Sequence, residues 1–240
     1  MKIIFILAIA LLAGFAQAAD ITVSHSGGQF SSIQAAINAA SPSDTIYVLS
    51  GHYHECVTLN KPLNLLGVNT NGTKPTIDAS YYLSPITIAS NAVNIRGFNV
   101  IHSPDNFAGI YGETNQSTIR NVTATENYDG IHLEKSYNNT ILNNNVSNNT
   151  HNGIILYYKS ESNFIENNEV AYQRHTSGYH QHSFGIALDL VCAYNVVKNN
   201  IVHDNDIGVG EGDARHDNVL INNTYYNNNN SLATYFTTYS

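Results

Sequence analysis

The chain has 240 residues, of which 42% are hydrophobic and only 12% are charged, and its formal net charge is −8. Globular domains carry about 25% charged residues at a similar hydrophobic content, so disorder driven by charge is excluded. The acidic balance argues against a nucleic-acid partner, because phosphate binding needs a basic surface. The chain is instead rich in asparagine, with 34 residues. Asparagine favours tight turns, so this composition points to a fold with many of them.

The first 18 residues have the features of a secretory signal peptide. Lys2 precedes an apolar run over residues 3–16, and Ala16-Gln17-Ala18 forms a small-x-small cleavage pattern. A retained anchor is the alternative, although the run is short for a bilayer span. No second apolar stretch of spanning length follows. The sequence therefore predicts a mature protein without a membrane span, located at the cell surface, in the periplasm or outside the cell.

Residues 19–45 predict an N-terminal strand and a capping helix. Ile33 and Ile37 fall on one face of a helix over residues 30–40, which a Ser-Ser pair begins and a Ser-Pro pair ends. An open stack of strands exposes the polar groups of its first edge. We expect this helix to cover that edge, with the first strands following at 45–49, 57–59 and 63–66.

A repeat of about 22 residues occupies most of the remaining chain. Glycine followed by Ile or Val recurs at steps of 21, 23, 32 and 23 residues, and each later unit also carries an Asn-x-Ile-x-Asn-Asn motif or a close variant. A leucine-rich repeat has a similar period, but no helix-period segment is present here. Short β-branched runs separated by Asn and Gly predict strands joined by tight turns. The repeat glycines are Gly109, Gly130, Gly153, Gly185 and Gly208.

Stacking such units coil upon coil gives a single-domain, all-β parallel β-helix. We expect about eight coils over residues 46–225 and a C-terminal tail over residues 226–240, where a partner or a second copy can cover the last coil. Two columns of asparagine suit left-handed turns and amide ladders between coils about 4.8 Å apart. The first column is Asn121, Asn143, Asn167, Asn199 and Asn222, and the second is Asn144, Asn168, Asn200 and Asn223.

The opening of this region resembles a known superfamily. The run Phe30-Ser-Ser-Ile33-Gln34 and the later Gly51-His-Tyr53-His-Glu55 are similar to the first coil of pectin-lyase-like proteins. With the Asn-rich repeats, the chain is most similar to the NosD-type right-handed β-helix proteins, also called carbohydrate-binding and sugar-hydrolysis (CASH) domains. The resemblance implies a right-handed parallel β-helix at a cell surface. It implies no activity, because this fold hosts lyases, hydrolases, epimerases, esterases and non-catalytic proteins.

No catalytic block of the pectin methylesterases, polygalacturonases or pectate lyases occurs in the sequence, so no catalytic residue is carried over. Geometry supplies other candidates, since outward residues of neighbouring coils stack on one face. Stacked carboxylates raise each other's proton affinity, which can produce a general acid beside a base. A solvated row of acids is the alternative interpretation. The catalytic candidates are His132, Glu134 and Asp189, and the carbohydrate-binding candidates are Tyr111, Glu113, Tyr157, Arg174 and Tyr179.

The 32-residue step inserts a polar loop at about residues 172–182, whose histidines are candidates for part of a metal site. His180 and His182 fall on one side of an extended segment and His175 lies nearby, a set that can bind Zn or Cu. An exposed polar loop is the alternative, and the sequence demands none of Ca, Zn or Cu. His52 and His54 form a second His-x-His pair, interpreted as decoration of the usual first-coil pattern of the superfamily.

Three functions remain open at the level of sequence. The first is a secreted or cell-surface protein that binds polysaccharide or glycoprotein without evident catalysis. The second is a polysaccharide hydrolase or lyase that acts on the outer face of the sheet, and the third is a NosD-like copper-handling accessory protein. Cys56 and Cys192 are predicted to lie ~25 Å apart or more, too far for a disulfide.

Overall fold

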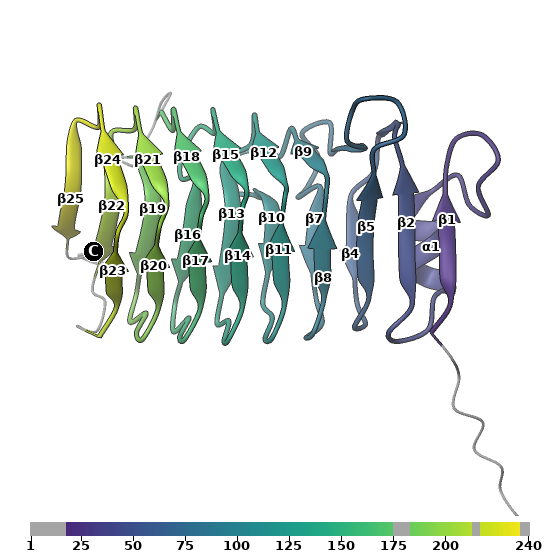
Figure 1. Ribbon diagram of the computed structural model, residues 1–240, viewed down its shortest axis with the longest axis horizontal. Helices are drawn as coiled ribbons and strands as arrows, with labels where there is room; N and C mark the ends of the chain where they lie inside the picture. Colours follow the sequence, from purple (N-terminus) through teal and green to yellow (C-terminus); the bar gives the residue numbers. More distant parts are fainter. Residues whose placement is uncertain (1–17, 175–182, 213–216, 236–240) are drawn as a thin grey trace, which may run out of the picture.

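The computed structural model describes residues 18–174, 183–212 and 217–235 as a right-handed parallel β-helix of about eight coils with one short helix. Each full coil contributes one strand to each of three parallel sheets, which run the length of the solenoid (Figure 1). The predicted fold, its coil number and its N-terminal helix are therefore confirmed.

We name the sheets A, B and C. Sheet A contains β1 (Asp20–Val23), β2 (Thr45–Leu49), β5 (Asn64–Val68), β8 (Asn94–Arg96), β11 (Thr118–Arg120), β14 (Thr140–Leu142), β17 (Phe164–Glu166), β20 (Val196–Lys198) and β23 (Val219–Ile221). Sheet B contains β3 (His52–Tyr53), β6 (Thr76–Asp78), β9 (Asn99–Ile101), β12 (Thr123–Thr125), β15 (Asn145–Ser147), β18 (Glu169–Ala171), β21 (Ile201–His203) and β24 (Thr224–Tyr226). Sheet C contains β4 (Val57–Leu59), β7 (Ile86–Ile88), β10 (Ala108–Gly112), β13 (Asp129–Glu134), β16 (Ile154–Tyr157), β19 (Phe184–Asp189), β22 (Ile207–Gly212) and β25 (Asn230–Tyr235).

The helix α1 (Ile33–Ala39) covers the first edge of sheet C, as the sequence predicts. Ser32 is its N-cap and accepts a hydrogen bond from the backbone of Ala35. The side chain of Gln34 supplies a hydrogen bond that a further strand would otherwise supply, because its Oε1 accepts from the backbone N–H of Thr58 in β4 at 2.7 Å. Ile33 and Ile37 are fully buried against the first coils. The helix thus covers an edge strand whose backbone N–H and C=O groups would otherwise be exposed and unpaired.

The core is a set of apolar columns inside the coil, because alternate strand residues point inward. In sheet A, register places Ile119 beside Ile141 and Ile141 beside Ile165, and all three are buried. Val197 and Leu220 continue the same column. This inward column is the one predicted from the repeats.

Asparagine has two separate roles at the corners between sheets. The column that begins at Asn121 adopts left-handed backbone angles, with φ of 52–56° from Asn121 to Asn222. The adjacent column is buried and forms the amide ladder, with Asn144 bonded to Asn168 and Asn168 to Asn200. Two further ladders run along the other corners, through Asn139, Asn163, Asn195 and Asn218 and through Asn127, Asn149, Gln173, Asn205 and Asn228.

At the C-terminal end, the β-helix continues past residue 225, the boundary predicted from the sequence. Strand β25 pairs in parallel with β22 and adds an eighth strand to sheet C. The segment after 225 is therefore partly a coil of the solenoid and not only a tail. The two cysteines are free, as predicted. Cys192 is buried beside the backbone oxygens of Leu156 and Asp189, and burial raises the pKa of its thiol to about 12.

Candidate functional site

The predicted carbohydrate-binding and catalytic residues of sheet C lie on neighbouring coils. Register pairs Tyr111 with His132 across β10 and β13, and Glu134 with Tyr157 across β13 and β16. The His132 ring lies edge-on to both tyrosines, at centroid distances of 5.5 Å from Tyr111 and 5.6 Å from Tyr157. These side chains lie on one outer face in two neighbouring rows, with Tyr111 and His132 in the first and Glu134 and Tyr157 in the second, as stacking of the repeats predicts.

A hydrogen-bonded network surrounds two glutamates of this outer face, Glu113 and Glu134. The Tyr111 hydroxyl lies 3.3 Å from Glu113 Oε1 and 3.2 Å from Glu134 Oε2. Lys135 Nζ lies 2.8 Å from Glu134 and 3.3 Å from Glu113. Burial raises the pKa of Glu134, but the hydrogen bonds from Lys135 and Tyr111 outweigh it, and the net pKa is lowered. The expectation of a raised proton affinity is therefore wrong for Glu134, because a lysine joins the two carboxylates.

Asp129 is a member of this site that the sequence interpretation missed. It is 4% exposed, and its carboxylate lies 3.2 Å from His132 Nδ1 and 2.9 Å from His151 Nδ1. The backbone N–H of Asn152 donates to the same carboxylate. Burial raises the pKa of Asp129, yet the two histidine hydrogen bonds outweigh it and hold that pKa well below its usual range. The signal in the sequence is an acid directly before a repeat glycine, Gly130.

We expect the Asp129 carboxylate to make stability depend on pH below about 4. Its folded-state pKa lies below the unfolded value of about 3.9, so its stabilisation is present above that pH and is lost as the pH falls. Asp129→Asn should lower the free energy of unfolding at neutral pH by about 2 kcal/mol and flatten its decline in acid. Guanidinium denaturation at pH 7 and at pH 3 measures both effects. The exposed Asp105→Asn is the control, and equal curves for all three proteins would contradict the prediction.

The remaining predicted residues of the outer face separate from this network. Asp189 lies two coils beyond Glu134, is 9% exposed and accepts a hydrogen bond from the backbone N–H of Leu190. Arg174 is exposed and its backbone N–H donates to Asn149. The structure therefore gathers Tyr111, Glu113, His132, Glu134 and Tyr157. Asp189 lies one coil beyond Tyr157, and Arg174 lies apart from this group. Tyr179 and the predicted metal ligands His175, His180 and His182 lie outside the described residues.

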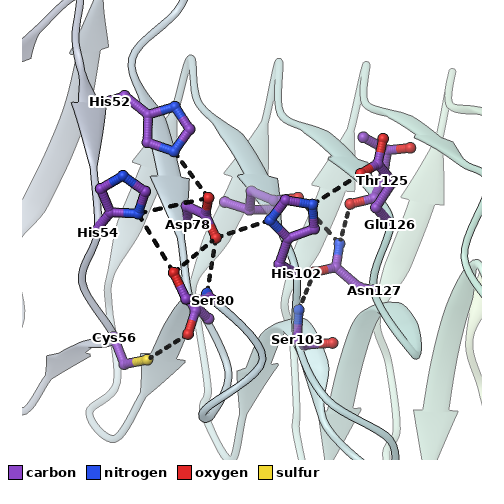
Figure 2. Close-up of polar contacts among 12 residues, drawn as sticks. His52, His54, Cys56, Asp78, Ser80, His102, Ser103, Thr125, Glu126 and Asn127 are labelled. Carbon is purple, nitrogen blue, oxygen red and sulfur yellow. Dashed lines mark hydrogen bonds and ion pairs between the residues drawn. The ribbon is translucent and has the colours of Figure 1, made fainter.

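A second cluster of titratable side chains lies at the end of the first strands of sheet B (Figure 2). His52 Nε2 lies 2.9 Å from Asp78 Oδ2, and His54 Nδ1 lies 3.7 Å from the same oxygen. The His52 and His54 rings are 4.4 Å apart. Parallel register of β3 with β6 explains this placement, because His52 pairs with Thr76 and the next pairing, Tyr53 with Ile77, leaves His54 beside Asp78.

The other oxygen of Asp78 is held from the opposite side. Asp78 Oδ1 accepts from the backbone N–H of Ser80 at 2.8 Å and lies 2.9 Å from His102 Nδ1. His102 Nε2 in turn lies 2.9 Å from Glu126. Burial raises the pKa of Asp78, but the hydrogen bonds from His52, Ser80 and His102 outweigh this effect and lower the pKa to about 2. The carboxylate is therefore ionised at neutral pH.

Two neighbours of the His-x-His pair have structural roles instead. Glu55 accepts from the backbone N–H groups of Ile33 and Gln34 and from the Ser32 hydroxyl, so it stabilises the first turn of α1. Cys56 is partly buried, and burial raises the pKa of its thiol. Neither side chain belongs to the cluster around Asp78.

Comparison with known proteins defines the class to which this parallel β-helix belongs. The family described as "Periplasmic copper-binding protein (NosD)" matches residues 37–238. The chain belongs to the NosD family.

Both a sequence relative and solved structures match most of the chain. A cell surface glycoprotein of Methanothermus fervidus is 35% identical over 182 residues, which cover 71% of this chain and 30% of that glycoprotein. The alginate lyase of Paenibacillus sp. FPU-7 superposes with a TM-score of 0.57 at 13% identity, over 90% of this chain and 98% of the lyase. A pectin methylesterase crystallised with a hexasaccharide superposes with a TM-score of 0.57 at 15% identity, over 82% of this chain and 78% of the esterase. Among the described residues, no helix has the length and apolar character of a bilayer span.

Proposed function

We propose that this chain is an extracytoplasmic surface protein that binds polysaccharide on the outer face of sheet C. Membership of a family described as periplasmic and similarity to a cell surface glycoprotein support the location. The chain spans 30% of the length of that glycoprotein, so the proposal concerns the β-helix and not a whole surface assembly.

One observation carries the proposal: aromatic, acidic and basic side chains meet at one end of three consecutive strands of sheet C. Tyr111 and Tyr157 supply ring faces, and Glu113 and Glu134 supply acceptors for sugar hydroxyls. Lys135 lies 5.6 Å from the centre of the partly exposed Tyr158 ring. Sugars are bound by aromatic faces together with a few oriented polar groups, which is the combination found here.

The protonation states favour binding over glycoside hydrolysis. An acid that protonates a leaving group needs a raised pKa, whereas the pKa of Glu134 is lowered by Lys135 and Tyr111. Asp189 lies two coils away, and its carboxylate accepts a hydrogen bond from the backbone N–H of Leu190. Glu134 therefore serves as an acceptor for sugar hydroxyls and not as the acid of an acid and base pair.

A lyase is the second candidate, and the Asp129–His132 pair is the observation that favours it. A carboxylate that orients a histidine by Nδ1 leaves Nε2 to remove a proton. His132 Nε2 has no hydrogen-bond partner in the part of the chain that the structure describes, but the atom is buried. Proton removal from a polysaccharide would require the Tyr111 and Tyr157 rings beside it to move.

Affinity electrophoresis of the purified chain through acidic and neutral polysaccharides tests the binding proposal. We expect Tyr111→Ala to weaken binding about fivefold, because loss of an aromatic contact costs about 1 kcal/mol. Tyr111→Phe keeps the ring and separates stacking from the hydroxyl contacts. Tyr194→Ala removes a tyrosine that is 57% exposed and lies outside this group of residues, so it is the matched control.

The outcomes are distinct. Retardation of the wild type that Tyr111→Ala weakens and Tyr194→Ala preserves supports the proposal, and equal retardation of all variants overturns it. The same incubations are read for new reducing ends and for the ultraviolet absorbance of unsaturated uronates. Unsaturated products formed by the wild type and absent with His132→Gln would show that the protein is a lyase and would overturn the proposal of binding without catalysis.

A further inference from the structure

We infer that His52, His54 and Asp78 form a divalent transition-metal site, with Cu²⁺ as the preferred ion. The three residues each offer one ligand atom, and these atoms all lie within 4.8 Å of one another. The site lies on sheet B, whereas the proposed polysaccharide face lies on sheet C, so the two are independent.

The donor atoms already stand at distances that suit a shared ion. Ligands about 2.0–2.1 Å from one metal are ~2.9 Å apart at the right angles of a square-planar site and ~3.3 Å apart at tetrahedral angles. Asp78 Oδ2 lies 2.9 Å from His52 Nε2, which matches the first value, and 3.7 Å from His54 Nδ1, which is slightly above the second. The His52 and His54 side chains are 49% and 67% exposed, so small rotations can bring both nitrogens to one ion.

The arrangement around Asp78 provides the outer support that ligating carboxylates usually have. Its Oδ1 is occupied by Ser80 and His102, which fixes the plane of the carboxylate. Its Oδ2 faces the two exposed imidazoles, and Figure 2 shows them on one side of Asp78 and His102 on the other. Glu126 in turn orients His102 through Nε2.

A network of hydrogen bonds and ion pairs accounts for only part of this geometry. The carboxylate is 7% exposed and is hydrogen-bonded to Ser80, His52 and His102. His54 Nδ1 makes only long contacts, 3.4 Å to Ser80 Oγ and 3.7 Å to Asp78 Oδ2, and its ring lies 4.4 Å from that of His52. A shared metal ion would use both imidazole nitrogens and the carboxylate oxygen as ligands.

The donor set also selects the class of metal. Imidazole nitrogen with one carboxylate suits Cu²⁺, Zn²⁺ and Ni²⁺ over Ca²⁺ and Mg²⁺, which prefer oxygen donors. Among these ions Cu²⁺ binds a given nitrogen and oxygen site most tightly. The residues therefore fit the metal in the family's description, which assigns no ligand in this chain. Three protein ligands at an exposed position leave coordination sites for water, as an exchangeable site requires.

The test is titration of the untagged, chelator-treated chain with Cu²⁺ alone and with Zn²⁺ alone by calorimetry. Electron paramagnetic resonance of the Cu²⁺ form identifies nitrogen ligands. We expect one Cu²⁺ with imidazole coordination, bound more tightly than Zn²⁺. His52→Gln with His54→Gln should weaken binding ~100-fold or more, and His102→Gln ~10-fold, the range for outer-shell residues. His203→Gln, a histidine of the same sheet that bonds to Asp204, is the matched control.

A rival site is tested in the same series, because the sequence also predicts metal ligands at His175, His180 and His182. A variant with all three replaced by Gln should keep the Cu²⁺ affinity and the spectrum of the wild type. Loss of binding in that variant, with binding retained in the His52 and His54 double variant, overturns the inference. Thermal unfolding of each metal-free variant confirms that it folds. Added Cu²⁺ should raise the midpoint for the wild type and not for the double variant.

Discussion

Asn168→Ala, in the ladder that also contains Asn144 and Asn200, should destabilise the protein by about 4 kcal/mol. Asn168 is 1% exposed, and its Oδ1 accepts from both the backbone N–H and the Nδ2 of Asn144. Its own Nδ2 donates to the backbone oxygen of Ile141 and to Asn200 Oδ1. Removal of the amide breaks a hydrogen bond at four buried polar atoms. A buried polar atom left without a partner costs about 1–3 kcal/mol, and about 1 kcal/mol for each of the four gives the expected total.

Chemical denaturation with circular dichroism measures this change, and a matched variant controls for the loss of an asparagine as such. Asn145 is an exposed asparagine of the preceding repeat, where it follows the ladder residue Asn144. Asn145→Ala should alter stability by no more than about 0.5 kcal/mol. Similar effects for the two variants would show that the buried ladder is not a main source of stability.

Gly153→Ala should destabilise the protein by about 3 kcal/mol or more. A Cβ at this position would lie 2.5 Å from the backbone oxygen of Gly185 and 2.5 Å from Val170 Cγ1. The oxygen belongs to the backbone of the next coil and cannot move without opening sheet C between β16 and β19. Overpacking of a rigid core typically costs about 1–3 kcal/mol, and a clash with backbone costs more.

The control for this prediction is Gly112→Ala in the same sheet. A Cβ there would meet only side-chain atoms, with Ile88 and Leu133 at 3.2 Å. These side chains can yield by a few tenths of an ångström, so the change in stability should be below about 1.5 kcal/mol. Thermal and guanidinium unfolding distinguish the two variants. A Gly153→Ala protein as stable as Gly112→Ala would contradict this account of the repeat.

The close approach of coils explains why glycine recurs before Ile or Val. At Gly130, Gly153, Gly185 and Gly208 an added Cβ would lie 2.5–2.7 Å from a backbone oxygen of the following coil. The corner is filled by a ladder amide and by a valine from sheet B, such as Val170 at Gly153. The repeat is therefore fixed by packing at this corner and carries no information about activity.

The sequence alone determined the solenoid. The period, the inward apolar columns and the asparagine-rich corners are local properties that recur in every coil. Each repeat therefore favours the same structure, and the parallel register follows from the stacking of equivalent positions. The separation of asparagine roles was not determined in the same way. Asn143 and Asn144 are adjacent in sequence, and only the three-dimensional turn places one in the left-handed region and buries the other in the ladder.

Only the tertiary structure decided the sites, because each depends on contacts across coils. Asp78 reaches His52 from 26 residues away, and the same coil contact gives a pair of imidazoles above one ionised oxygen. Asp129 and His151, 22 residues apart, meet in the same way. Lys135 lowers the pKa of Glu134, whereas stacking of acids alone predicted the opposite. The sign of an electrostatic effect depends on which charges lie nearest, and the repeat period does not specify those neighbours.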